Sequence, residues 1–146
     1  MLKINIRTKP IKRFRVEDVG DYYWIISPVP EENVLKIVAA EMENQDYEFL
    51  IALHELIESY LLLKRGISFE EVDKYDMKFS QEQKEGKRPK NANAGDQKDC
   101  PYRKEHAFAA KMEKILANYL KVDWKQYEKH LDNILENYVQ KSSNSR

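Results

Sequence analysis

The sequence predicts an α+β domain in which a short N-terminal antiparallel sheet is followed by about four helices. Residues 2–7 alternate apolar and polar side chains, and residues 22–26 form an aromatic and β-branched run, both typical of strands. From residue 46 onward, apolar residues recur every three or four positions, the period of a helix. A length of 146 residues suits a single domain, which we place at residues 1–140, with a disordered tail at 141–146.

The segment at residues 33–42 fits either a strand or a helix, and we favour a strand. Pro30, Glu31 and Glu32 would make a good first helical turn. A helix here, however, would fuse with the next one into a single very long rod, and Asn44 and Asp46 are typical of a fresh helix start. The third strand of the sheet is therefore expected at this position.

The central helix is expected at residues 46–64, with Gly66 ending it. Its apolar side chains point in nearly every direction, and a helix of that kind is normally buried. It nevertheless carries His54, Glu55 and Glu58, of which His54 and Glu58 project from the same side because they are four residues apart. A buried carboxylate costs several kcal/mol unless a cation neutralises it, so an Arg, a Lys or a metal ion should lie beside it.

A second helix and a long polar segment follow. Ser68 and Glu71 predict a capping box at the helix start, and Asp76 shares the apolar face of this helix with phenylalanine and valine. Residues 81–98 are rich in Lys, Gln, Asn and Gly and have no apolar face. We expect a flexible loop there, which could act as a lid over a site.

Two further helices complete the predicted domain. Asp99 should cap the third helix, with Pro101 near its first position, and Asp123 should cap the fourth. His130 falls on the polar side of the fourth helix and is expected to be exposed. The expected core faces comprise Phe108, Met112, Ile115, Leu116 and Tyr119 in the third helix, and Trp124, Tyr127, Leu131, Ile134, Leu135 and Tyr138 in the fourth.

Composition excludes several classes of protein. Basic and acidic residues are equal in number, at 25 each, so net charge suggests neither a nucleic acid nor an anionic membrane as partner. The N-terminus lacks the apolar run of a signal peptide, and no segment has the length and hydropathy of a membrane span. The single cysteine, Cys100, allows no internal disulfide and suits a reducing compartment. These features predict a cytoplasmic protein; substrate and oligomeric state are left open.

The five residues from His54 to Glu58 resemble the His-Glu-x-x-His helix of zinc-dependent peptidases, the zincins. In those enzymes two histidines four residues apart bind one metal ion, and the glutamate between them is the general base for the bound water. Here Glu58 stands in place of the second histidine. A carboxylate still binds zinc, and its harder oxygen also suits manganese or iron. The resemblance implies a loosely zincin-like fold and a divalent metal ion, preferably zinc.

A catalytic metal needs a third protein ligand and an open position for water. His106 is the preferred third ligand, because a site that already contains Glu58 gains less from another carboxylate; Asp76 and Glu105 are the alternatives. In this hypothesis the protein is a metal-dependent hydrolase, with a peptide bond as one candidate substrate. Glu55 would serve as general base, and Tyr102 would orient the substrate or the oxyanion.

A larger part of the chain also resembles a family of small, uncharacterised bacterial and phage proteins. The resemblance rests on residues 47–66, on Val72-Asp73-Lys74-Tyr75-Asp76, and on Pro101-Tyr102-Arg103-Lys104-Glu105-His106, about two thirds of the chain. It implies that His54, Glu55, Glu58, Asp76, Glu105 and His106 act as one group. It implies no particular reaction.

Three other readings compete with a metallohydrolase. His54 and Glu58 could bond each other or a loop lysine, with Glu105 pairing Arg103 or a nearby lysine, in a metal-free polar network. The protein would then be a non-enzymatic accessory or interaction protein of the phage type. An unrelated ligand site is a further alternative. A di-metal carboxylate bundle is disfavoured, because no helix carries the Glu-x-x-His pair that such sites use.

Overall fold

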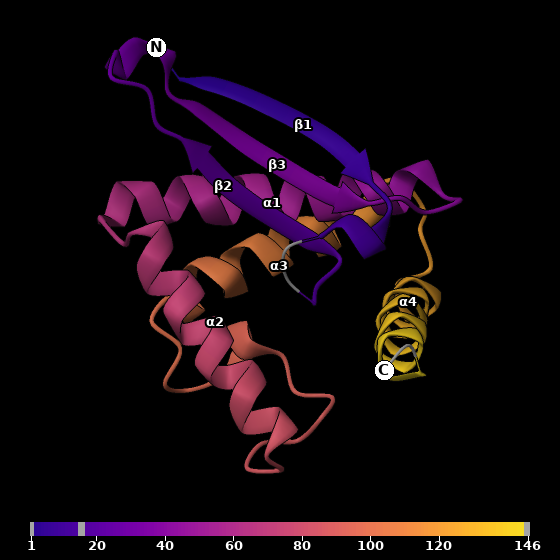
Figure 1. Ribbon diagram of the computed structural model, residues 1–146. Helices are drawn as coiled ribbons and strands as arrows, with labels where there is room; N and C mark the ends of the chain where they lie inside the picture. The colour runs from indigo at the N-terminus through magenta and orange to yellow at the C-terminus, as the bar shows by residue number, and fades with distance from the viewer. Residues whose placement is uncertain (1, 15–16, 145–146) are drawn as a thin grey trace.

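The computed structural model describes residues 2–14 and 17–144, and over these residues it has a small sheet followed by four α-helices (Figure 1). The predicted α+β class is therefore confirmed. In chain order the elements are β1 (Lys3–Lys9), β2 (Gly20–Ile25), β3 (Val34–Ala40), α1 (Gln45–Arg65), α2 (Phe69–Lys84), α3 (Arg103–Tyr119) and α4 (Trp124–Asn144), with short 3-10 turns at Ile11–Arg13, Pro30–Glu32 and Ala94–Asp96.

The sheet is mixed, with the strand order β1-β3-β2. β2 pairs antiparallel with β3, as expected, whereas β1 pairs parallel with β3, with Ile6 opposite Ile37. The segment between β1 and β2 is too long for a tight hairpin, so these two strands are free to lie on opposite sides of β3. β3 takes the centre because it is the most apolar strand, and its residues Leu35, Ile37 and Ala39 are fully buried.

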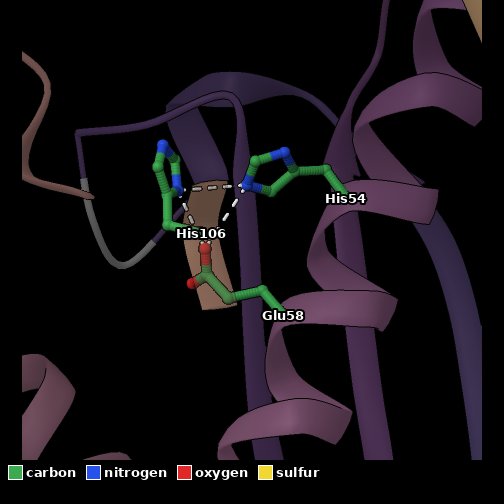
Figure 2. A group of neighbouring side chains, drawn as sticks. All are labelled: His54, Glu58 and His106. Atoms are coloured by element: carbon green, nitrogen blue, oxygen red, sulfur yellow. Dashed lines mark hydrogen bonds and ion pairs between the residues drawn. The ribbon is translucent and has the colours of Figure 1, made fainter. Parts of the chain in front are cut away.

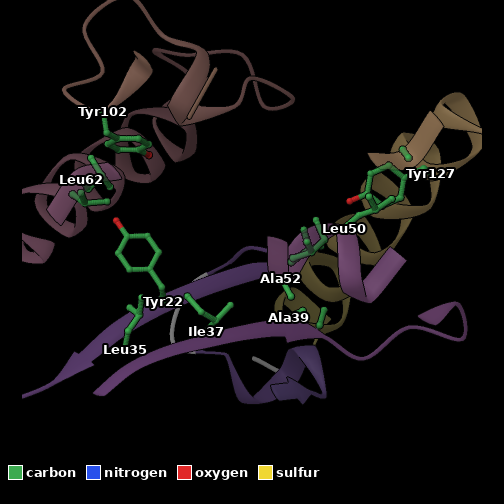
Figure 3. Packing of buried hydrophobic residues seen from close by; sticks show 14 of the residues in the cluster. Tyr22, Leu35, Ile37, Ala39, Leu50, Ala52, Leu62, Tyr102 and Tyr127 are labelled. Carbon is green, nitrogen blue, oxygen red and sulfur yellow. The ribbon is translucent and has the colours of Figure 1, made fainter. Parts of the chain in front are cut away.

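Local signals fix both ends of α1, which lies across one face of the sheet (Figure 1). The Asn44 side chain accepts hydrogen bonds from the backbone N–H groups of Asp46 and Tyr47, which would otherwise lack a partner. Gly66 ends the helix in the left-handed conformation with φ 75°, which costs glycine little. Buried side chains of β3 and α1 form the core, and Ile37, Ala39, Leu50 and Ala52 are among those shown in Figure 3.

α2 begins as predicted and ends later than predicted. Ser68 and Glu71 form the capping box, and the helix continues to Lys84, so the first residues assigned to the 81–98 loop belong to it. Arg88 lies in the segment that follows α2 and forms two ion pairs. One is with Glu82 near the end of α2, and the other is with Asp99, whose carboxylate lies 2.6 Å from Arg88 Nη2. The role of this segment as a lid remains a prediction.

The predicted start of α3 is wrong, and its predicted core face is right only in part. Asp99 does not cap the helix, which begins at Arg103; its carboxylate accepts hydrogen bonds from Arg88 and Tyr75 instead, because a charged partner is within reach. The buried face of α3 consists of Glu105, Ala109, Glu113 and Ala117, whereas Phe108, Ile115 and Tyr119 are 49%, 53% and 82% exposed. Met112 and Leu116, the other two residues of the predicted face, are half-buried, and Leu116 packs against the core. The two alanines allow α3 to approach α1 closely.

α4 packs against the core through Tyr127, which is fully buried (Figure 3). Asp123 accepts a hydrogen bond from the Gln126 N–H at the start of the helix, as predicted. The prediction for His130 is wrong, because this residue is half-buried and its ring lies 5.2 Å from that of Tyr47. Helical structure extends to Asn144, and the last two residues of the predicted tail lie outside the described residues. None of the helices described is long and apolar enough to cross a membrane.

Candidate metal centre

Three donor atoms from α1 and α3 converge on one point (Figure 2). His54 Nε2 lies 3.3 Å from Glu58 Oε2 and 3.2 Å from His106 Nδ1, and the last two atoms are 2.9 Å apart. His54 and Glu58 are buried and His106 is half-buried. The structure therefore brings together the two predicted α1 ligands and the preferred third ligand.

The local structure explains why these side chains meet. α1 and α3 run antiparallel, since Arg65 near the end of α1 bonds Glu105 at the start of α3, while His54 bonds Glu113 further along α3. The His106 ring is held from the other side by Gly95, where any Cβ atom would lie only 2.4 Å from the ring. Glycine is thus required at this position for the ring to keep its place.

The triangle of donor atoms has the dimensions of a metal site. Zinc binds histidine nitrogen and carboxylate oxygen at about 2.0–2.1 Å in a tetrahedral arrangement, so two neighbouring ligand atoms lie about 3.3 Å apart. The three separations in the cluster, 2.9 to 3.3 Å, match this edge to within a few tenths of an ångström. Three protein donors leave the fourth tetrahedral position open, as catalytic zinc sites do.

Glu113 contacts His54 on the ring nitrogen that faces away from the cluster. The sequence analysis does not identify this residue. Its Oε2 lies 2.8 Å from His54 Nδ1, and its Oε1 accepts a 2.5 Å hydrogen bond from the Tyr127 hydroxyl on α4. A carboxylate that accepts the second ring N–H of a histidine directs the first nitrogen toward a metal. The sequence signal was the four-residue spacing that Glu113 shares with Glu105 and Ala109, which places it on the buried face of α3.

The charges of the cluster can be balanced either by a proton or by a metal ion. Burial lowers the pKa of His54, but hydrogen bonds with Glu113 and Glu58 outweigh it and raise the pKa to about 11. Burial raises the pKa of Glu58, but its hydrogen bonds with His106 and His54 outweigh burial and bring this pKa below its ordinary value. Without a metal ion, His54 is therefore an imidazolium between two carboxylates; a divalent cation would replace its Nε2 proton.

Glu55, the predicted general base, lies beside the cluster rather than in it. Its carboxylate packs against β2 at Gly20, where an added Cβ would be 2.3 Å from Oε1. Burial, followed by the negative charge of Glu58, raises the pKa of Glu55 well above its ordinary value, and Asp18 and Asp21 act in the same direction. A raised pKa is common among carboxyl groups that act as general acids or bases. Its role as base remains a prediction.

The remaining predicted residues have other partners. Tyr102 donates a 2.5 Å hydrogen bond to Asp76, and burial followed by that hydrogen bond leaves the pKa of Asp76 at about 7. Glu105 accepts a 2.7 Å bond from Arg65, so its partner is neither Arg103 nor a lysine. Among the described residues, the three-donor group includes neither Asp76 nor Glu105, the two alternative third ligands.

Comparison with models of protein families, with characterised proteins and with solved structures finds no match, so neither a family nor the zincin likeness is supported from outside the chain. The function must be argued from the cluster itself.

Proposed function

We propose that this protein is a metal-dependent hydrolase that holds one divalent ion, preferably zinc, on His54, Glu58 and His106. The observation that carries the proposal is the triangle of donor atoms with tetrahedral edge lengths. Two nitrogen donors and one oxygen donor favour zinc, while the oxygen of Glu58 leaves manganese and iron as alternatives. The ion would supply Lewis acidity and lower the pKa of a bound water.

The residues around the triangle fit this chemistry. Glu113 orients His54 through its Nδ1–H, and Tyr127 fixes Glu113 in turn. Glu55 lies beside the ligands, and its pKa is raised by burial and by the charge of Glu58, so it is the residue that we propose as general base. Peptide bonds are the first substrate class to test, because the His-Glu-x-x-Glu spacing resembles that of metallopeptidases.

The metal site is tested first. The protein is purified without an affinity tag and analysed by elemental mass spectrometry, and zinc binding is then measured by competition with a chromophoric chelator. About one ion per chain is expected, with loss in His54→Ala, Glu58→Gln and His106→Ala. His130→Ala is the matched control, since it removes the chain's third histidine, which lies outside the cluster. A wild-type protein that binds no ion and whose melting temperature ignores both zinc and chelator would refute the site.

Hydrolysis is tested separately, with Glu55→Gln. This variant keeps the three ligands, so it should bind zinc normally, while hydrolysis of a peptide library should fall by about 100-fold or more if Glu55 is the base. Normal zinc binding with unchanged hydrolysis would refute the role of Glu55 and leave the metal site intact. Zinc binding without hydrolysis of any substrate would refute the enzymatic part of the proposal.

One observation favours the alternative, a non-enzymatic accessory or interaction protein of the phage type with a structural polar cluster. Each cluster residue has a hydrogen-bond partner within the protein: His54 with Glu113, and His106 with Glu58. A fully satisfied buried network can serve packing alone. In that case Glu58→Gln would lower the melting temperature equally with and without zinc, whereas the hydrolase proposal requires zinc to raise it in the wild type only.

A further inference from the structure

The outermost strand of the sheet, β1, has one open edge. Figure 1 shows β3 between β1 and β2, and within residues 2–14 and 17–144 no strand other than β3 pairs with β1. Every residue from Lys3 to Thr8 is exposed, whereas the first three residues of β2, at the opposite edge, are buried. An exposed edge strand is a template on which another extended chain can pair.

The register with β3 determines which backbone groups of β1 face the open edge. The backbone N–H of Glu41 donates a hydrogen bond to the carbonyl oxygen of Lys9, so this oxygen points toward β3. Successive residues of a strand direct their N–H and C=O groups to opposite sides. The backbone groups of Ile4, Ile6 and Thr8 therefore point to the open edge, as a row of donors and acceptors that no strand of the described chain uses.

The side chains of the same three residues lie on the α1 side of the sheet and border a groove. Ile6 is directly opposite Ile37, which belongs to the core between the sheet and α1, yet Ile6 is 49% exposed. A groove of about 370 Å³ lies between Ile6 and Phe49 of α1, and the small side chains of Ala39 and Ala52 also line it. The groove has room for an apolar side chain of a strand added beside β1.

The side chains on the other face of β1 are basic. Lys3, Arg7 and Lys9 project there, because alternate residues of a strand share a face. Residues 2–14 contain five basic side chains and no acidic one, although the whole chain carries equal numbers of each. Two copies paired antiparallel about Ile6 would set Lys3 against Lys9, and like charges directly opposite are destabilising. Acidic side chains on the added strand would instead be attracted.

We infer that the open edge of β1 binds an extended segment of a partner protein in which apolar and acidic side chains alternate. The segment would extend the sheet by one strand, with its apolar side chains beside Ile6 and its acidic side chains beside Lys3 and Arg7. In this mode of recognition, backbone hydrogen bonds give affinity and the alternating side chains give specificity. The inference does not depend on the proposed hydrolase activity, because Glu55 and the metal cluster lie beside β2, at the other edge.

The experiment measures binding of fluorescein-labelled peptides to the full chain by fluorescence anisotropy. The acidic peptide Glu-Val-Glu-Ile-Glu-Val-Glu should bind with a dissociation constant in the micromolar range. The same peptide with lysine in place of every glutamate should bind at least about tenfold more weakly, because its charges repel those of β1. A copy of the acidic peptide with two neighbouring prolines at its centre should lose binding by a similar factor, because proline cannot donate a backbone hydrogen bond.

Substitutions locate the peptide on the protein. Ile6→Glu should weaken binding of the acidic peptide at least about tenfold, by placing a like charge at the groove. Ile25→Glu is the matched control, because Ile25 is 46% exposed on β2, at the opposite edge, and should leave binding unchanged. The double variant Lys3→Glu with Lys9→Glu should bind the lysine peptide better than the acidic one. The far-ultraviolet circular dichroism spectrum of each variant confirms that the fold is retained.

Hydrogen exchange followed by nuclear magnetic resonance tests the backbone contacts. The amide protons of Ile4, Ile6 and Thr8 should exchange more slowly once the acidic peptide is bound, because their N–H groups face the open edge. Absence of peptide binding, equal binding of the acidic and lysine peptides, or binding that Ile6→Glu leaves unchanged would overturn the inference. A dimer that Ile6→Glu dissociates would also overturn it, because the edge would then be occupied by a second copy of this chain.

Discussion

Replacing Glu113 by glutamine tests whether the carboxylate behind His54 supports metal binding. The glutamine keeps the shape of the side chain and removes its negative charge. In the wild type, Oε2 lies 2.8 Å from His54 Nδ1 and Oε1 accepts the hydrogen bond of the Tyr127 hydroxyl. The amide oxygen of glutamine can satisfy only one of these two donors well, since the other end of the group is itself a donor.

The expected effect is a loss of zinc affinity with little change in the number of sites. Removing a carboxylate that supports a metal-binding histidine typically weakens binding by about 10–100-fold, or roughly 1.4–2.7 kcal/mol. We expect a value in the upper half of this range, because the group is buried and carries two hydrogen bonds. The dissociation constant is measured by competition with a chelator of known affinity, at fixed pH.

Glu105→Gln is the matched control for this variant. Glu105 is a buried acid on the same face of α3, two turns earlier, but its partner is Arg65 rather than a ligand. This variant should bind zinc as tightly as the wild type. Equal zinc affinity in Glu113→Gln and Glu105→Gln would refute the supporting role of Glu113, and with it the argument that the cluster is built for a metal.

Further predictions concern three other positions. Gly95→Ala should weaken zinc binding at least tenfold, measured by the same competition, because the added Cβ displaces the His106 ring; an unchanged affinity would contradict the packing described. Asn44→Ala should lower the free energy of unfolding by about 1 kcal/mol in urea denaturation, through loss of the α1 cap, and a value near zero would mean that another group replaces it. Asp76→Asn, studied in the presence of chelator, tests a pH effect. The pKa of Asp76 is raised to about 7 in the folded protein. The stability that its protonated form contributes is therefore complete below about pH 4 and is lost as the pH rises through 7. The asparagine variant should therefore gain stability relative to the wild type over that range, by up to about 4 kcal/mol, and parallel pH profiles would refute the raised pKa.

The sequence was informative wherever the deciding interaction is local. The ends of α1 follow from Asn44 and Gly66, each acting on its own neighbours in the chain. His54 and Glu58 were identified because a spacing of four residues on a helix is sufficient to bring them together. His106 required one further step, the preference of a site that already contains a carboxylate for a nitrogen ligand.

Features that depend on tertiary packing could not be predicted in this way. Asp99 has the residue type of a helix cap, and only the position of Arg88 in space shows that it forms an ion pair instead. The parallel pairing of β1 with β3 leaves no mark in either strand, because an alternating pattern fits both strand directions. Glu113 could be linked to His54 only once α3 was known to run antiparallel to α1.

α1 carries apolar side chains in nearly every direction because its three sides have different environments. One side of the helix packs on the sheet through Ile51 and Ala52, and a second side meets α3 through the polar cluster at His54. The third side carries Phe49 and Leu63 and is exposed in a single chain. Periodicity alone cannot distinguish a stripe that packs within the chain from one that stays exposed, which is why the sequence also predicts Phe108, Ile115 and Tyr119 in the core. A helix that is apolar all round is normally buried, and α1 meets that expectation on the two sides that the sheet and α3 cover.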